Sequence, residues 1–207
     1  MKTLIIVDIQ YDFLPGGSLA VPGGDEIIPV VNNLTEHFDL VVATQDWHPP
    51  DHASFASNHP GKKPFDRIEL GGMDQVLWPN HCVQGTRGAE LPAALDSRRV
   101  EAIFRKGMDP GIDSYSGLFD NGHKKSTGLG DYLKGKKADN VFVVGLAGDY
   151  CVYYTVMDAL MIGFRAVLIE DATRVISDAG YQTALQAMRD KGAEVISSSD
   201  FILSLSA

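Results

Sequence analysis

Short apolar runs recur along this chain, separated by stretches whose apolar residues are spaced three or four apart. The run at residues 3–7 is continuous and β-rich, which is typical of a strand covered on both faces. Five later runs have a similar character. The pattern predicts strands over residues 3–7, 40–44, 100–104, 141–144, 166–169 and 194–196.

Helical patterns lie between most of these runs. Ile27, Val31, Leu34 and Phe38 repeat with the spacing of one helix face. The alternation favours an α/β fold of three layers, a mostly parallel sheet with helices on both faces. We expect helices over residues 25–38, 129–134, 153–163, 179–191 and 199–205.

Two long segments, residues 46–88 and 107–127, interrupt the alternation. Both follow predicted strands, at the strand ends where open α/β sheets bind ligands. Long irregular segments in a compact domain are often functional. We therefore expect one domain over residues 1–207, with its chemistry concentrated in these loops.

Composition and charge narrow the classes of partner. The chain has 207 residues, 44% of them apolar, and a formal net charge of −9. That charge argues against a nucleic acid or an acidic membrane surface as partner, and no run is long enough to span a bilayer. We interpret residues 1–8 as a first strand rather than a signal peptide, so the two cysteines are expected to be free thiols in the cytoplasm.

Cys151 is the residue that most suggests a reaction. It follows the apolar run of residues 140–145 and a glycine-rich turn, and it precedes a helical pattern. This order places the thiol at a helix N-terminus, where the helix dipole favours the thiolate. The free backbone amides of such a turn can also hold an oxyanion.

Two charged residues lie at corresponding strand ends. Asp8 follows the first strand and Lys106 follows the strand of residues 100–104. Taken singly, an aspartate there often caps a turn, a lysine is often a solvated charge, and a cysteine such as Cys151 is often a small buried apolar group. Together they supply a base, a cation and a thiol at one edge of a parallel sheet, although Asp12 is an alternative to Asp8.

Asp46, His48 and His81 form a candidate metal site within the loop region of residues 46–88. Asp46 and His48 point the same way in extended chain, and four of the six histidines fall in this segment. An aspartate with two histidines suits one divalent ion, Zn, Fe or Mn, and leaves coordination positions open. The roles of His52, His59 and Cys82 stay open at this point.

Four apolar side chains have two interpretations. They can form the wall of a ligand pocket or belong to the ordinary core, and their spacing does not decide between these. The glycine pairs near the N-terminus lack the spacing of a dinucleotide-binding or P-loop motif, which argues against a nucleotide site. The four residues are Phe13, Leu19, Trp78 and Tyr115.

The chain resembles the nicotinamidases (pyrazinamidases) of the isochorismatase-like cysteine hydrolases. The resemblance runs almost end to end, and the order and joint presence of short motifs make it specific. The motifs are residues 7–13, 16–21, 44–49, 78–83, 105–107, 113–116 and 145–152.

The resemblance implies a six-stranded parallel sheet between helices and a catalytic triad of Asp8, Lys106 and Cys151. It also implies that the backbone amides of Ala147 and Cys151 hold the oxyanion. Relatives have a cis peptide bond before the matching alanine, here Leu146-Ala147. The family usually has threonine where this chain has Gly148, and we expect only a modest effect from the missing hydroxyl.

For the metal, the resemblance implies one divalent ion bound by Asp46, His48 and His81. Some relatives add a further histidine, which His52 would supply. Isochorismatases proper lack both the nucleophilic cysteine and this metal set, so the combination favours the nicotinamidase branch. The pyridine nitrogen of nicotinamide would bind the metal, and its ring would pack against Phe13, Leu19, Trp78 and Tyr115.

The resemblance thus leads us to expect the hydrolysis of nicotinamide to nicotinate and ammonia in NAD salvage, through a thioester, with pyrazinamide as a further substrate. One alternative is a hydrolase of the same superfamily that acts on another small amide. A second is a protein that binds a metal or senses redox state through its thiol without catalysis. The sequence leaves the oligomeric state open, a homo-oligomer included.

Overall fold

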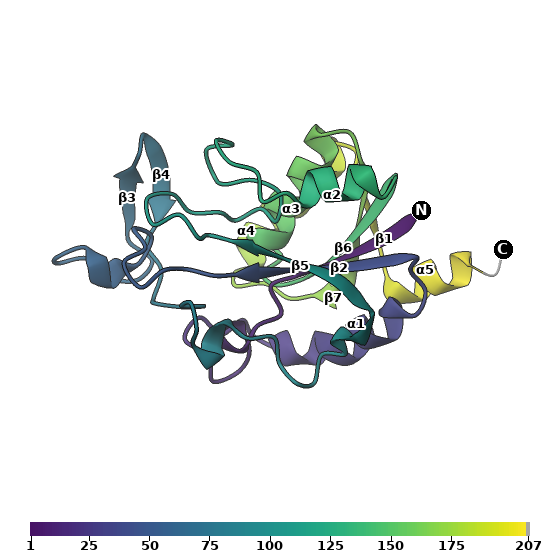
Figure 1. Cartoon of the computed structure of the whole chain (residues 1–207), viewed down its shortest axis with the longest axis horizontal. Helices are drawn as coiled ribbons and strands as arrows, with labels where there is room; N and C mark the ends of the chain where they lie inside the picture. The colour runs from purple at the N-terminus through teal and green to yellow at the C-terminus, as the bar shows by residue number, and fades with distance from the viewer. Residues whose placement is uncertain (206–207) are drawn as a thin grey trace.

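A six-stranded sheet forms the centre of the computed structural model, which describes residues 1–205 (Figure 1). Its strands run in the order β5-β2-β1-β6-β7-β8, and every pairing between neighbours is parallel. This confirms the predicted parallel sheet. The strands are β1 (Lys2–Val7), β2 (Leu40–Asp46), β5 (Val100–Lys106), β6 (Asn140–Gly145), β7 (Arg165–Thr173) and β8 (Glu194–Ile196).

Helices cover both faces of the sheet. On one face lie α1 (Ile28–Thr35) and α5 (Ser198–Ser204), and on the other lie α2 (Leu129–Gly135), α3 (Cys151–Met161) and α4 (Asp178–Asp190). Alternate residues of β1 belong to the two apolar cores, Leu4 and Ile6 to the first and Ile5 and Val7 to the second. The period of two in a strand explains why β1 is apolar throughout.

Several element boundaries differ from the predicted ones. The helix expected over residues 25–38 is a 3₁₀ turn, Gly24–Ile27, followed by the shorter α1, which has Pro29 in its first turn. Proline lacks an N–H and is favoured in a first helical turn, so it fixes where α1 begins. β7 extends to Thr173, beyond the predicted end at residue 169.

The segment of residues 46–88 contains a hairpin that the pattern analysis missed. β3 (Arg67–Leu70) and β4 (Met73–Val76) pair in antiparallel fashion around Gly71 and Gly72, which both have positive φ. A two-residue Gly-Gly connection is a recognised hairpin signal. The flanking strands were missed because each has only four residues, half of them polar.

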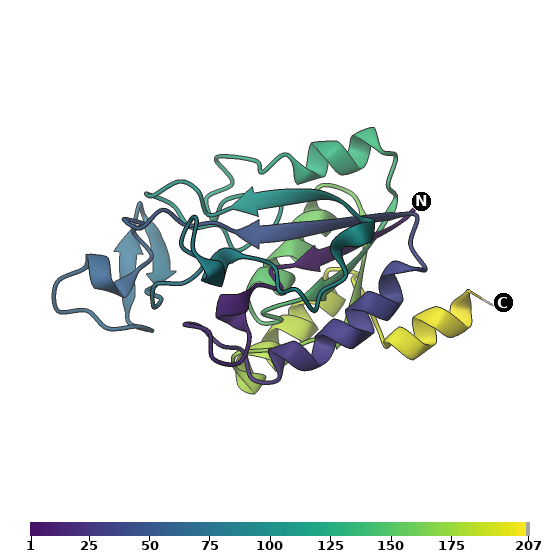
Figure 2. The ribbon, with the colours of Figure 1, turned by 60° about the horizontal axis from the view of Figure 1, so that its bottom comes forward.

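The carboxyl ends of the parallel strands gather the candidate residues. The arrowheads of the purple, blue and teal strands, β1, β2 and β5, point toward the segment of residues 46–88 (Figure 2). The last residues of β2 and β5, Asp46 and Lys106, are direct partners across the ladder. This is the edge at which open α/β sheets bind ligands.

Within residues 1–205, no helix is both long and apolar enough to cross a bilayer. Cys82 and Cys151 are both free, as the sequence predicts.

Candidate active site

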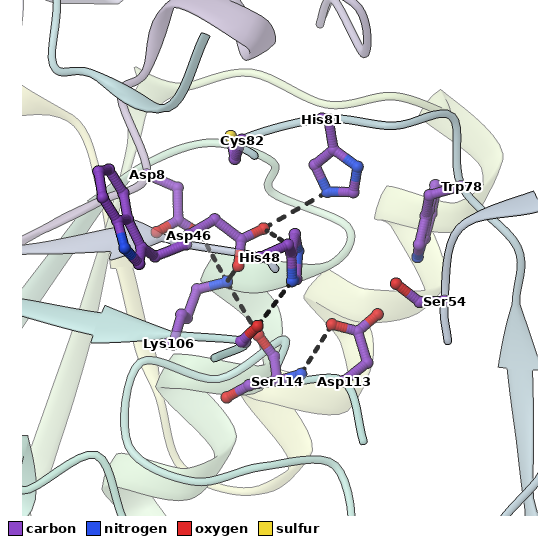
Figure 3. A network of polar contacts seen from close by, with 12 residues as sticks. Asp8, Asp46, His48, Ser54, Trp78, His81, Cys82, Lys106, Asp113 and Ser114 are labelled. Atoms are coloured by element: carbon purple, nitrogen blue, oxygen red, sulfur yellow. Dashed lines mark hydrogen bonds and ion pairs between the residues drawn. The ribbon is translucent and has the colours of Figure 1, made fainter. Parts of the chain in front are cut away.

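The Lys106 ammonium lies at the centre of a buried polar cluster at this edge (Figure 3). It donates hydrogen bonds to Asp46 Oδ1 at 3.1 Å, to the Ser114 carbonyl at 2.9 Å and to Cys151 Sγ at 3.5 Å. Asp8 Oδ2 lies 2.9 Å from the same nitrogen, and both side chains are 0% exposed. One cation therefore joins the thiol to two carboxylates.

Asp8 follows β1 with φ +47°, a left-handed conformation that turns the chain away from the sheet. Its Oδ1 accepts a hydrogen bond of 2.6 Å from the Thr44 hydroxyl. Its Oδ2 has an ion pair with Lys106 but no hydrogen bond of good geometry among residues 1–205. One carboxylate oxygen is thus fixed by Thr44, and the other is available to accept a proton.

Cys151 is the first residue of α3, as its sequence context predicts. The Leu146-Ala147 peptide bond that precedes this turn is cis. Within residues 1–205, neither the Ala147 N–H nor the Cys151 N–H donates to a backbone or side-chain acceptor. Two unpaired amide donors beside a thiol match what an oxyanion hole requires.

Burial changes the expected ionisation of the thiol. It raises the pKa of Cys151 well above the ordinary value, although Lys106 acts to lower it. Desolvation thus opposes the thiolate that the helix N-terminus and the cation favour. A base must take the thiol proton as the sulfur reacts.

The two carboxylates near Lys106 respond differently to the same surroundings. Burial raises the pKa of Asp8, with Lys106 opposing and Asp46 adding to the shift. Burial also acts to raise the pKa of Asp46, but His48 and Lys106 hold it well below the usual range. Of the two carboxylates, Asp46 is therefore the stronger acid, and the raised pKa of Asp8 suits it to exchange a proton. Asp46 and Asp8 in turn hold the pKa of Lys106 well above its ordinary value, against its burial.

Asp46, His48 and His81 converge as buried side chains whose ligand atoms lie within 4.8 Å of one another. Asp46 Oδ2 is 3.1 Å from His48 Nε2 and 3.5 Å from His81 Nε2. Figure 3 shows both rings directed at this carboxylate. A convergence of one carboxylate and two imidazoles suits a divalent ion such as zinc.

The second nitrogen of each ring fixes its tautomer. His48 Nδ1 lies 2.9 Å from the Gly107 carbonyl, and His81 Nδ1 lies 2.8 Å from the Pro79 carbonyl. Because a carbonyl only accepts, both Nδ1 atoms carry a proton, so Nε2 is the nitrogen that has a lone pair for a metal when each ring is neutral. This is the second-sphere arrangement that metal-binding histidines show.

His52 is buried nearby but is oriented differently. Its Nδ1 accepts from the Ser54 backbone N–H at 3.2 Å and lies 2.7 Å from the Ser54 hydroxyl. A neutral ring that accepts at Nδ1 carries its proton on Nε2, so His52 does not present a lone pair there. His52 belongs to a second group of close donor atoms, with His48 and Asp113, and not to the group of Asp46, His48 and His81.

The four apolar residues singled out in the sequence lie around one pocket that also contains Cys151 and His81. Tyr150 forms edge-to-face contacts with Trp78 and Tyr115, at centroid distances of 4.9 and 5.5 Å. The pocket thus joins the thiol to the candidate metal ligands through an apolar wall. The four residues are Phe13, Leu19, Trp78 and Tyr115.

Sequence reasoning missed several residues of this site. Asp113, Tyr150 and Ile176 also line the pocket, and Gln75 Nε2 donates to Asp113 Oδ2 at 3.0 Å and to the Tyr115 hydroxyl at 2.9 Å. Asp113 belongs to a motif that carries the family resemblance, which is a signal for a role in the site. Gln75 lies on the hairpin, so no strand-end argument could have found it.

Gly148 is surrounded by branched side chains. A Cβ placed there would lie 2.8 Å from Thr173 Cγ2 and 2.9 Å from Val175 Cγ1. Gly148→Thr, which restores the usual family residue, is therefore expected to destabilise the protein by about 1–3 kcal/mol through overcrowding. Thermal unfolding measures the effect. Gly180→Ala is the control, because its nearest neighbours are 3.6 Å away; an unchanged or raised Tm for Gly148→Thr would contradict the expectation.

Comparison with known proteins shows the family to which the chain belongs. The model of the isochorismatase domain matches residues 2–200, and the chain belongs to the isochorismatase family. A nicotinamidase of Acinetobacter baylyi is 50% identical over 201 residues, 97% of this chain and 94% of the relative. The structure of an Acinetobacter baumanii nicotinamidase and pyrazinamidase superimposes with a TM-score of 0.95 at 47% identity and covers 97% of each chain. A Pyrococcus horikoshii pyrazinamidase in complex with zinc has a TM-score of 0.78 at 37% identity, covering 95% of this chain and 98% of that one.

Proposed function

We propose that this protein hydrolyses nicotinamide to nicotinate and ammonia, and pyrazinamide to pyrazinoate, by covalent catalysis at Cys151. The observation that carries the proposal is the Lys106 ammonium, which contacts the thiol, Asp8 and Asp46 at once. A thiol, a proton acceptor and a candidate metal carboxylate held by one buried cation are the parts that a positioned amide hydrolysis needs. The product, nicotinate, would then be used in NAD salvage.

The chemistry follows from the atoms in place. Asp8 Oδ2 takes the thiol proton while Cys151 Sγ attacks the amide carbon, and the N–H groups of Ala147 and Cys151 stabilise the oxyanion. Asp8 then gives its proton to the departing ammonia as the C–N bond breaks. A thioester remains, and Asp8 accepts a proton from the water that hydrolyses it, which regenerates the thiol and releases the acid. Lys106 stabilises the negative charge that develops on the sulfur as it attacks the amide and again as it leaves the thioester.

We propose that Asp46, His48 and His81 hold one divalent metal ion. The fit rests on the Nδ1–H contacts that turn Nε2 of both rings toward Asp46, and on the carboxylate of Asp46, whose pKa is held well below the usual range by His48 and Lys106. When bound, the ion supplies a Lewis-acid anchor for the ring nitrogen of the substrate and acts as a template for the carboxamide. The nitrogen and oxygen ligands suit zinc, iron or manganese, and the zinc complex of the Pyrococcus horikoshii pyrazinamidase supports zinc.

We propose that the aromatic and apolar wall selects a flat ring. Phe13 and Leu19 come from the segment that follows β1, and Trp78 and Tyr115 come from the two long loops. Removal of water by such a wall strengthens the polar contacts inside the site. The two free thiols are consistent with a reducing cytoplasm, where we place the enzyme.

Asp46→Ala is expected to lose the metal and raise the KM for nicotinamide by at least about tenfold, with a smaller change in kcat. The reason is that the substitution removes the carboxylate that both imidazoles face. Metal content by atomic absorption and steady-state kinetics measure the two effects. Asp12→Asn is the matched control, because Asp12 binds the Cys82 N–H and lies outside the ligand set. Full metal occupancy in Asp46→Ala would contradict the ligand assignment.

Ammonia release from a panel of amides, before and after chelation, tests the proposed function. Nicotinamide and pyrazinamide carry a ring nitrogen that benzamide, of the same shape, lacks. We expect rapid release from the first two, little from benzamide or an aliphatic amide, and loss of activity after chelation that added metal restores. Equal turnover of benzamide would contradict the proposal that the metal binds the ring nitrogen. Turnover of aliphatic amides alone would show that the substrate is another small amide.

A further inference from the structure

β2 loses its β1 partner before it ends. The β1–β2 ladder has its last pair at Ile6 and Ala43, whereas on the other side β2 pairs with β5 as far as Asp46. The chain leaves β1 at Asp8, whose positive φ directs it away. The main-chain groups of Asp46 that face the β1 side therefore need a different partner, because buried N–H and C=O groups are costly to leave unpaired.

The Gln10 side chain supplies that partner. Its Oε1 accepts from the Asp46 N–H at 2.8 Å, and its Nε2 donates to the Asp46 carbonyl at 2.8 Å. The second hydrogen of Nε2 goes to the Ala89 carbonyl, also at 2.8 Å. Gln10 is 0% exposed, so all three bonds are shielded from water. One carboxamide takes the place of a neighbouring strand at the residue that faces both imidazoles.

We propose that Gln10 is a positioning residue for the metal site, which it serves by fixing the main chain of Asp46. The inference rests on the proposed metal ligands. Asp46 has to direct Oδ1 at Lys106 and Oδ2 at the two histidines simultaneously, with separations of 3.1 to 3.5 Å. Hydrogen bonds to both the N–H and the carbonyl of Asp46 fix its main chain, and with it the direction of the Cα–Cβ bond from which the carboxylate reaches the two imidazoles.

Gln45 offers a matched control from within the same network. Its Nε2 donates to the same Ala89 carbonyl at 2.8 Å, so its loss removes a comparable buried hydrogen bond. Its side chain makes no hydrogen bond to Asp46 in the part of the chain that the structure describes. Gln10→Met and Gln45→Met both replace a buried amide with an apolar chain of similar length. Only Gln10→Met removes the hydrogen bonds to the main chain of Asp46.

The experiment measures Zn²⁺ affinity by competition with a chromophoric chelator, in the wild type and in Gln10→Met and Gln45→Met. We expect Gln10→Met to weaken Zn²⁺ binding about 10–100-fold and Gln45→Met to weaken it less than about threefold. Thermal unfolding of the metal-free proteins measures the stability loss, and the d–d absorption of the Co²⁺-substituted proteins reports ligand geometry. A general structural role would lower stability in both variants and leave the Co²⁺ spectrum unchanged.

Equal Zn²⁺ affinity in Gln10→Met and Gln45→Met, with unchanged Co²⁺ spectra, would overturn the inference. Should Gln10→Met fail to fold, Gln10→Glu and Gln45→Glu take their places, because glutamate keeps the size and an acceptor for the Asp46 N–H. The same excess loss of affinity is expected for Gln10→Glu, and its absence overturns the inference as well. Failure of the wild type to bind Zn²⁺ would overturn the proposed metal site itself, which is a distinguishable result.

Discussion

Cys151→Ala is expected to reduce the turnover of nicotinamide by at least about 10⁴-fold, because removal of a nucleophile eliminates the covalent route. The substitution removes one atom that lies 3.5 Å from the Lys106 ammonium and leaves Asp46, His48 and His81 in place. Metal binding should therefore match that of the wild type. Ammonia release under saturating nicotinamide measures the first effect, and Zn²⁺ stoichiometry measures the second.

Cys82→Ala is the matched control for this prediction. Cys82 is the other buried free cysteine, and its sulfur contacts only the Gly88 carbonyl, at 4.0 Å, among the described hydrogen-bond partners. Its truncation should lower thermal stability modestly and leave kcat within a few fold of the wild type. Turnover by Cys151→Ala near the wild-type level would rule out the thioester mechanism. Loss of metal in Cys151→Ala would show that the thiol also supports the metal site.

The fold was largely predictable because its central strands are covered on both faces. β1 and β6 are continuous apolar runs for this reason, and their positions follow from the sequence alone. The β3–β4 hairpin was not predictable in the same way, because its strands have only four residues each, half of them polar, and β3 has no buried position. The sharp entry into α1 depends on Pro29, which a helical periodicity does not register.

The site was predictable where the topology alone brings residues together. The strands β5, β2 and β1 are neighbours in a parallel sheet, so their carboxyl ends lie at one edge. The proximity of Asp8, Asp46 and Lys106 follows from their places at these ends. The role of Gln10 could not be predicted, because it depends on where the β1–β2 ladder stops. The orientation of the His52 ring could not be predicted from the sequence either, because it depends on a hydrogen bond from the Ser54 N–H to Nδ1.

The ionisation of the thiol shows a further limit of sequence reasoning. A helix N-terminus and a nearby lysine both argue for a thiolate at Cys151, and each is present as predicted. Burial of the whole cluster reverses the balance and raises the pKa of the thiol. The same burial raises the pKa of Asp8, which makes it a better proton acceptor than an exposed aspartate. The depth of the site, which a sequence does not encode locally, thus increases the need for the carboxylate base that the sequence already predicts.

Asp8→Asn is accordingly expected to lower kcat/KM for nicotinamide by about 10³–10⁴-fold, near the upper range for loss of a general base. Asparagine keeps the shape of the side chain and can still accept from the Thr44 hydroxyl, but it cannot take the thiol proton. The wild-type activity should fall as the pH decreases through the raised pKa of Asp8, because the protonated carboxyl no longer accepts. The pH profile of kcat/KM measures this acidic limb, which the Asp8→Asn residual activity should lack.

Thr44→Val separates this role from a purely structural one. The Thr44 hydroxyl donates to Asp8 Oδ1 at 2.6 Å and acts to lower the pKa of Asp8. Its removal favours the protonated carboxyl, so the acidic limb should move to higher pH while the plateau at alkaline pH stays within about tenfold of the wild type. An acidic limb that persists in Asp8→Asn, or that does not move in Thr44→Val, would assign the proton transfer to a group other than Asp8. Movement in Thr44→Val together with loss in Asp8→Asn would establish that this one carboxylate carries the proton from the thiol to the leaving ammonia.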